Sequence, residues 1–188
     1  AMTSTVGQFK VEVLASRVTD INPSVQVDAE VSFFTPRNAD DLLDRGFDAV
    51  VDAIDAPTVK AILIAGCKRR QIPVVTTGGA GGRVDPTAIR VDDLNRTKND
   101  RLLMHVRKML RQRHGFPPGK KAPPFGVPTV WSTEWPRFPS ADGGVCETPE
   151  ETEGAPRRLD CELGFGAATF VTGTMGFVAA AVRAREPG

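Results

Sequence analysis

The sequence has no tyrosine, only two histidines and only three cysteines among its 188 residues. With so little histidine and tyrosine, carboxylates are the main candidates for acid–base chemistry. The cysteines, at positions 67, 146 and 161, form no CxxC pair and no even set. This spacing argues against a zinc site built on paired cysteines and against a disulfide framework. No secretory leader precedes them, so we expect a reducing, cytoplasmic location.

An excess of charge of either sign is also missing, because 24 Lys and Arg residues face 23 Asp and Glu residues. Overall charge therefore predicts no particular partner, and any such argument must rest on local charge. Residues 164–182 form an uncharged run of 19 residues, close to the roughly 20 that cross a bilayer. Four glycines and three threonines make this run weakly hydrophobic. We predict a helix buried in a protein core or a dimer contact, with a membrane anchor as the alternative.

Patterns of helix and strand alternate along the chain with short links. Apolar residues at helical spacing predict an amphipathic helix over 5–21, and alternating apolar residues predict a strand over 25–33. Further helices are predicted over 36–45, 57–70 and 98–114, and further strands over 47–54, 72–76, 88–91 and 127–132. This alternation predicts an α/β fold with a parallel, doubly wound, Rossmann-like sheet. A domain of that kind normally opens with a strand and a glycine-rich turn, whereas this chain opens on a helix.

Two carboxylates, Asp52 and Asp55, follow the strand predicted over 47–54. Ligands bind at the carboxyl ends of strands in open α/β sheets, and a carboxylate there can hold Mg²⁺ on a nucleotide phosphate. Alternatively, Asp55 only caps the helix that starts at Pro57. Lys10 lies beside the apolar stripe of the first helix, so its amine either reaches a phosphate at the edge of the sheet or extends into water.

A glycine-rich segment, Gly78–Gly82, comes directly after the strand predicted over 72–76. Such a segment either cradles a phosphate or makes a tight turn. A phosphate loop belongs between the first strand of the fold and its helix, whereas this segment follows the third predicted strand. We therefore predict a tight turn that brings backbone close to the site.

Basic residues gather between positions 96 and 121, where nine Lys and Arg residues accompany one acid, Asp100. An inner apolar stripe on the helix over 98–114 leaves Arg101, Lys108 and Arg111 facing outward. An outward basic face suits the phosphate backbone of a nucleic acid, although many charged faces are only solvated.

Four motifs in this order resemble the adenylating enzymes related to ubiquitin-activating enzyme, ThiF and MoeB, the ThiF/MoeB/HesA family. They are Val6-Gly-x-x-Lys10-x-Glu12, Ile21-Asn22-Pro23, Asp52-Ala-x-Asp55 and Thr76-Thr-Gly-Gly-Ala-Gly-Gly82. Later motifs resemble the bacterial tRNA threonylcarbamoyladenosine dehydratase branch of that family. These are Asp85-Pro86-Thr87, Asp93-Leu94, Ser132-Thr133-Glu134, Asp142-Gly143, Leu159-Asp160-Cys161 and Gly164-Phe-Gly-Ala-Ala-Thr169. The resemblance covers nearly the whole chain.

This resemblance implies ATP-dependent dehydration of threonylcarbamoyladenosine in tRNA to its cyclic form through an acyl-adenylate. Lys10 matches the nucleotide lysine of the family and Asp55 its Mg²⁺ aspartate, with Asp52 beside it. Cys161 matches a cysteine that is either a nucleophile or a passive thiol. The resemblance also implies a homodimer and leaves sulfur-relay partners open.

The family's ATP loop, ribose aspartate and phosphate arginine would all precede the first helix of this chain. We therefore expect an N-terminally truncated domain whose sheet is mixed and partly antiparallel toward its C-terminal part, and which is inactive alone. Residues 3–115 would form the remainder of the nucleotide-binding domain, 116–163 a proline-rich crossover with a mobile loop, and 164–186 a closing apolar helix.

Two alternative functions remain open for this sequence. One is adenylation of a ubiquitin-like sulfur carrier protein, and the other is a noncatalytic dimerisation module. The lack of CxxC pairs and the basic helix over 98–114 favour tRNA over a sulfur carrier.

Overall fold

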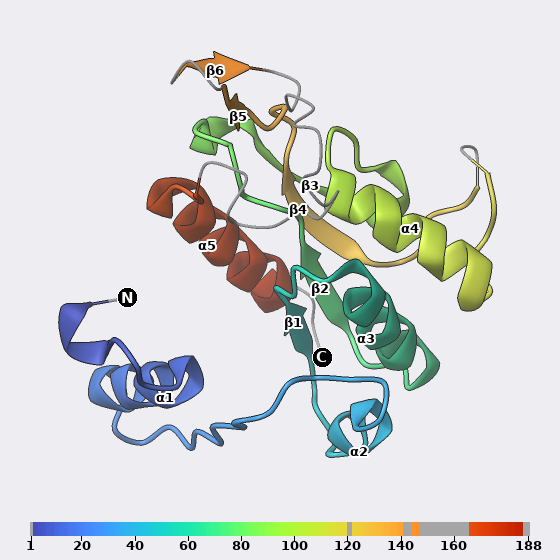
Figure 1. Ribbon diagram of the computed structural model, residues 1–188. Coiled ribbons are helices and arrows are strands. Elements are labelled where there is room, and N and C mark those ends of the chain that lie inside the picture. The colour runs from blue at the N-terminus through green and yellow to red at the C-terminus, as the bar shows by residue number, and fades with distance from the viewer. Residues whose placement is uncertain (1, 120–121, 141–143, 147–165, 186–188) are drawn as a thin grey trace. The chain divides into compact units, whose positions relative to one another are not determined.

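The computed structural model describes residues 2–119, 122–140, 144–146 and 166–185 (Figure 1). The chain divides into two compact units, Ala1–Thr35 and Pro36–Gly188, which are described separately.

The first unit contains a short 3₁₀-helix, η1 (Thr3–Thr5), and helix α1 (Lys10–Ile21). Helix α1 confirms the helix predicted near the start of the chain, and its apolar side chain Leu14 is 56% exposed. The strand predicted over 25–33 is wrong, because this segment is neither helix nor strand and belongs to no described sheet. Alternating apolar residues give a segment two faces, but a strand also needs a neighbour whose backbone groups it can pair with.

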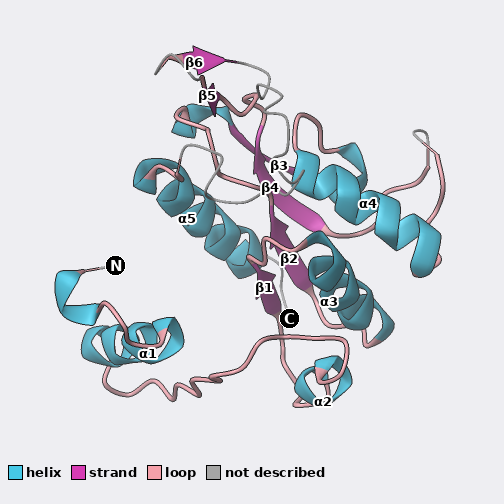
Figure 2. Ribbon diagram, viewed as in Figure 1, coloured by secondary structure: helices cyan, strands magenta, loops and turns pink. Residues whose placement is uncertain are grey.

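The second unit is built on a four-stranded sheet in the order β1-β2-β4-β3 (Figure 2). Its strands are β1 (Val50–Asp52), β2 (Val74–Thr77), β3 (Ile89–Asp93) and β4 (Pro128–Ser132). Strands β1, β2 and β4 are parallel, whereas β3 runs antiparallel to β4. The sheet is therefore mixed, with its antiparallel part toward the C-terminal side, which confirms the predicted fold class.

Helices cover both faces of this sheet, with α3 and α4 on one side and α5 on the other (Figure 1). Their bounds are Pro57–Arg69 for α3, Arg101–Arg113 for α4 and Thr169–Arg185 for α5, and a short helix, α2 (Ala39–Leu43), contacts α3. Two 3₁₀-helices flank β3, η2 (Pro86–Ala88) and η3 (Leu94–Arg96). Strands β5 (Phe138–Pro139) and β6 (Val145–Cys146) pair in a separate ribbon within the expected mobile loop.

Helix α5 buries one stripe of its surface against the sheet. Val171, Met175 and Ala179 recur every four residues and form a core cluster with Val75 of β2 and Val130 of β4. No helix in the described part of the chain has the length and apolar character to cross a membrane. One face of α5 thus packs into a protein core, as predicted.

Helix α3 buries Cys67 near its C-terminal end, with none of the residue exposed. Burial raises the pKa of this thiol to about 11, and the nearby Asp52 carboxylate adds to the shift. The thiol is therefore protonated at neutral pH.

The glycine-rich segment after β2 makes close backbone contacts, as a tight turn requires. A Cβ on Gly78 would lie 2.9 Å from Cβ of Trp131 and against the Asp100 carboxylate. Gly82 has a φ of 69°, and a Cβ there would lie 2.9 Å from the backbone nitrogen of Arg137. Both glycines are therefore needed for packing.

We predict that Gly82→Ala lowers the free energy of unfolding by about 1–3 kcal/mol, because its positive φ disfavours a side chain and Arg137 backbone fills the space. The matched control is Gly79→Ala in the same loop, where the nearest atom would be a guanidinium nitrogen of Arg83 at 3.5 Å, an ordinary van der Waals distance. Urea denaturation of both variants measures the difference. Equal stability of the two would contradict the packing role of Gly82.

Candidate functional site

The candidate site lies where the parallel strands β1 and β2 end. Asp52, the last residue of β1, is in register with Thr76 of β2, so both strands end at the same edge of the sheet. The turn that carries Asp55 follows β1, and the glycine-rich segment follows β2. The edge at which α/β folds bind ligands therefore presents a carboxylate beside a tight turn.

Asp52 is bonded inside the protein at both of its carboxylate oxygens. Oδ2 lies 2.9 Å from Nζ of Lys60 and accepts a hydrogen bond of 2.6 Å from the Thr76 hydroxyl. Oδ1 accepts a hydrogen bond of 3.0 Å from the amide of Ile54. Asp52 and Lys60 are both fully buried at their side chains. Both carboxylate oxygens of Asp52 thus have partners inside the protein, and its contact with a nucleotide stays a prediction.

Lys60 completes this buried cluster from the second turn of α3. Besides its pair with Asp52, its ammonium donates to the carbonyl of Ile54 at 2.9 Å and approaches the carbonyl of Asp52 at 3.5 Å. Burial lowers the pKa of Lys60, and the adjacent Asp52 carboxylate opposes that shift. The cluster joins β1, β2 and α3 in one hydrogen-bonded unit.

Asp55, in contrast, is exposed at the end of this turn. No side-chain hydrogen bond caps α3, whose N-cap residue is Ala56, so the alternative that Asp55 only caps the helix is not supported. Partial desolvation raises the pKa of Asp55, the charge of Lys60 opposes this, and Asp100 adds to it. Asp55 is thus an open carboxylate in a site with several charges.

The carboxylate oxygens at this edge of the sheet suit a cation that arrives already bound to a ligand. In the described part of the chain, no three His, Cys, Asp or Glu residues come together as a metal cage. Mg²⁺ is usually held by one or two carboxylates together with phosphate oxygens and waters. Asp55 alone, beside an inward-facing Asp52, fits that mode of binding.

A second buried ion pair holds the glycine-rich segment. Arg83 and Asp100 approach to 3.4 Å with side chains 3% and 1% exposed. Asp100 also accepts hydrogen bonds from the amide of Gly79 at 3.0 Å and from the amide of Leu103 at 2.9 Å, so it caps α4. Arg83 donates to the carbonyls of Gly79, Asn99 and Glu134. The segment after β2 is therefore fixed to the start of α4.

Two other predicted site residues lie where the structure does not test them. Lys10 is the first residue of α1 in the first unit, and it is exposed. Lys10 belongs to the first unit and Asp55 to the second, and the distance between residues of different units is not defined. Cys161 lies outside the described residues. Both assignments remain predictions.

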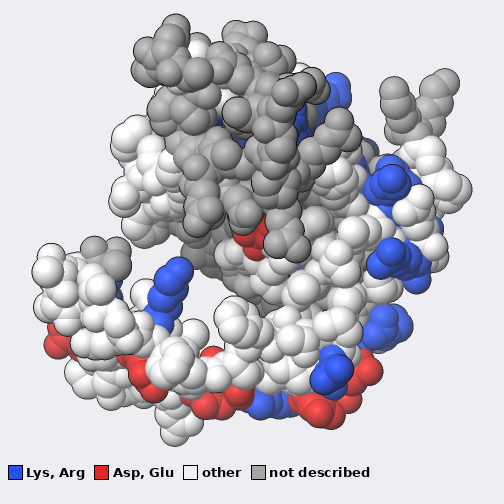
Figure 3. Space-filling model, viewed as in Figure 1, with Lys and Arg blue, Asp and Glu red and all other residues white. Residues whose placement is uncertain are grey.

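The three basic residues predicted to face outward on α4 differ in their surroundings. Arg101 and Lys108 are exposed, and Figure 3 shows Lys and Arg side chains along the edge where α4 and α3 lie. Arg111 is half-buried and donates to the carbonyls of Pro117 and Gly119 and to the side chain of Asn95. Arg111 thus lies outside the buried stripe of α4, as predicted, but its guanidinium holds the chain that follows α4.

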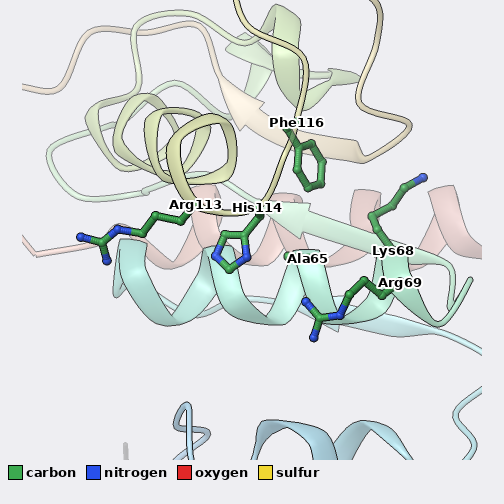
Figure 4. Close-up of a pocket in the computed structure, with 6 residues that line it drawn as sticks. All are labelled: Ala65, Lys68, Arg69, Arg113, His114 and Phe116. Atoms are coloured by element: carbon green, nitrogen blue, oxygen red, sulfur yellow. The ribbon is translucent and has the colours of Figure 1, made fainter.

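A hollow of about 470 Å³ lies between α3 and the end of α4 (Figure 4). It is lined by Ala65, Lys68, Arg69, Arg113, His114 and Phe116. Burial lowers the pKa of His114, and the charges of Arg69 and Arg113 add to this. No residue at the carboxyl ends of β1 and β2 lines the hollow. The hollow therefore belongs to the basic surface formed by Lys and Arg side chains of α3 and α4, and not to the candidate site.

Sequence reasoning did not identify Lys60, Arg83 and Asp100. Lys60 falls on the same helical stripe as Ile64 and Cys67, both fully buried. A lysine on a buried stripe, following a strand that ends in aspartate, signals an internal ion pair. Asp100 carries the weaker signal of an N-cap residue before an apolar stripe.

Comparison with known proteins adds sequence and structural relatives. Residues 1–178 match the profile of the ThiF family. A tRNA threonylcarbamoyladenosine dehydratase of Escherichia coli (strain K12) is 46% identical over 179 residues, covering 95% of this chain and 66% of that protein. A protein of the same name from Haemophilus influenzae is 44% identical, covering 95% of this chain and 65% of that protein. The chain thus spans just under two thirds of the length of these relatives.

A solved structure of the E. coli dehydratase in complex with ATP is also similar to this chain. It superposes with a TM-score of 0.76 at 37% sequence identity, covering all of this chain and 70% of the other. At this identity and coverage the fold of the two chains is shared.

We predict that Asp100→Ala lowers the free energy of unfolding by about 3–5 kcal/mol, because it leaves the buried Arg83 guanidinium without its partner. The control is Asp85→Ala, which removes the exposed cap of the short helix η2 and should cost about 1 kcal/mol. Urea denaturation compares the two. A similar loss in both variants would contradict the structural role of the Arg83–Asp100 pair.

Proposed function

Because this chain belongs to the ThiF family, we propose that it is part of an ATP-dependent enzyme that cyclises threonylcarbamoyladenosine in tRNA. The proposal is carried by the open carboxylate of Asp55, held at the end of parallel strands beside a buried ion pair. The relatives named tRNA threonylcarbamoyladenosine dehydratase support the substrate, and the complex of one of them with ATP supports the co-substrate. The same names favour RNA over a sulfur carrier as the acceptor.

The chemistry begins with the carboxylate of the modified nucleoside. One of its oxygens attacks the α-phosphorus of ATP, pyrophosphate leaves, and an acyl-adenylate forms. A nucleophile within the modification then attacks the acyl carbon, the ring closes, and AMP leaves. The net change is loss of water, with ATP converted to AMP and pyrophosphate.

Asp55 would hold Mg²⁺ that arrives on the phosphates, and the cation would offset the charge that develops there. The N-terminus of α3 follows Asp55 directly, and its dipole also favours negative charge. Lys10 would contribute a second positive charge to the phosphates. Cys161 would act either as a nucleophile on the acyl-adenylate or as a passive thiol. The rest of the nucleotide site is not assigned to any residue of this chain.

The tRNA would contact the basic surface on α4 through Arg101 and Lys108. Both side chains are exposed, and phosphate contacts of this kind give affinity without choice of sequence. We assign no phosphate contact to Arg111, because its guanidinium is bonded to the chain that follows α4.

We place the protein in the cytoplasm, as a homodimer. The outer face of α5 supports the dimer, because Phe170 and Phe177 lie seven residues apart on it and are 57% and 80% exposed. Sulfur-relay proteins are further possible partners. A noncatalytic dimerisation module gains no support from the open carboxylate at the strand edge.

We predict that Asp55→Asn lowers the rate of AMP formation at least about 10²-fold in the protein that contains this chain, because the cation on the phosphates loses its carboxylate ligand. The assay follows AMP and the mass of the modified nucleoside, with ATP and tRNA carrying threonylcarbamoyladenosine. Asp48→Asn, an exposed residue before β1, is the matched control. Unchanged turnover of Asp55→Asn would refute the assigned role.

We also predict that the double variant Arg101→Ala, Lys108→Ala weakens tRNA binding and reduces its salt slope by about 2, because two phosphate contacts are lost. The charge-matched control is Arg37→Ala, Arg45→Ala, which removes two exposed arginines from the segment around α2. Filter binding across a series of salt concentrations measures both. If the two double variants lose affinity equally, net charge and not the α4 surface determines binding.

A further inference from the structure

Lys60 uses its hydrogen-bonding capacity inside the protein. Its ammonium has three donors, and they are directed at the Asp52 carboxylate, the Ile54 carbonyl and, at a longer distance, the Asp52 carbonyl. Its side chain is fully buried. Lys60 is therefore not a group that contacts a ligand directly.

The bonds of Lys60 and Asp52 fix both peptide groups of Ile54. The Ile54 amide donates to Asp52 Oδ1, and the Ile54 carbonyl accepts from Lys60. That carbonyl shares a planar peptide group with the nitrogen of Asp55. Holding it in place therefore fixes the orientation from which the Asp55 side chain extends.

We propose that Lys60 is a positioning residue, which holds the turn after β1 through the Ile54 carbonyl and so directs the Asp55 carboxylate toward a cation. This inference rests on the proposed function, because it concerns the same carboxylate. It adds a residue that never touches the ligand but sets the geometry of the one that does.

A purely stabilising role does not account for this arrangement. Desolvation makes a buried ion pair costly, and apolar side chains of similar size are often as stable in its place. Apolar side chains cannot, however, donate hydrogen bonds to two carbonyls at the end of a strand. Directional bonds to the backbone are what the pair provides beyond packing.

The test therefore removes both charges together, so that neither is left buried alone. In the full chain, Asp52→Asn with Lys60→Met keeps the volume of the pair and loses the bonds to the two carbonyls. Lys68→Met on the same helix is the matched control, since its side chain lies on the exposed side. Thermal unfolding checks that each variant folds.

Two local measurements report on the turn. The first is hydrogen exchange at the amides of Ile54 and Asp55, which should become about tenfold faster in the double variant, because the turn that carries them loses the bonds from Lys60 to its carbonyls. The second is paramagnetic broadening of the same amide signals by Mn²⁺ alone, which should need several times more Mn²⁺ for the same effect. The Lys68→Met control should match the parent chain in both.

Asp55→Asn separates failure of this inference from failure of the proposed function. If Mn²⁺ broadens these signals equally in Asp55→Asn, the cation role of Asp55 is wrong, and the inference falls with it. If Asp55→Asn abolishes the broadening while the double variant matches the parent chain in both measurements, only the inference is overturned.

Thr76→Val serves if the double variant does not fold. It removes the hydroxyl that donates to Asp52 and keeps both charges and nearly all of the volume. Exchange at Ile54 and Asp55 should then be about threefold faster, and no change would also overturn the inference.

Discussion

The buried contact between Asp52 and Lys60 organises the end of the sheet. An isolated charge of either sign would be too costly in this fully buried position, so each side chain requires the other. The pair also constrains the backbone, because Thr76 of β2 donates to the same carboxylate and the Ile54 carbonyl accepts from the same ammonium. Strand β1, strand β2 and helix α3, which connects the two strands, are thereby held together at one point.

The glycine-rich segment shows the same principle on the next strand. There Arg83 and Asp100 form the buried pair, and Gly78 leaves the space that Asp100 occupies. Both pairs lie at the ends of parallel strands, where backbone groups leave the sheet ladder and need other partners. The chain satisfies these backbone groups with ionised side chains. The exposed Asp55 therefore lies beside backbone that is held by hydrogen bonds.

Much of the fold follows from the sequence, because burial on the sheet faces imposes clear periodicities. Helices α3, α4 and α5 and strands β1 to β4 all fall within or beside the predicted ranges. The segment over 25–33 was misassigned, since alternation records which side is apolar and not whether a partner strand is present.

The site was only partly predictable for a related reason. Asp55 stands at a position that topology alone marks as a ligand edge. The inward orientation of Asp52 depends on Lys60, eight residues later, and on Thr76 of another strand, so no local pattern reveals it. Arg111 fits an outward helical position by spacing, yet the chain after α4 folds back to accept its hydrogen bonds.

The protonated, enclosed thiol of Cys67 also limits the redox chemistry of the chain. Only the thiolate attacks electrophiles or oxidants, and a pKa of about 11 leaves almost none of it at neutral pH. Alkylation or oxidation of Cys67 would therefore signal that α3 has come away from the sheet.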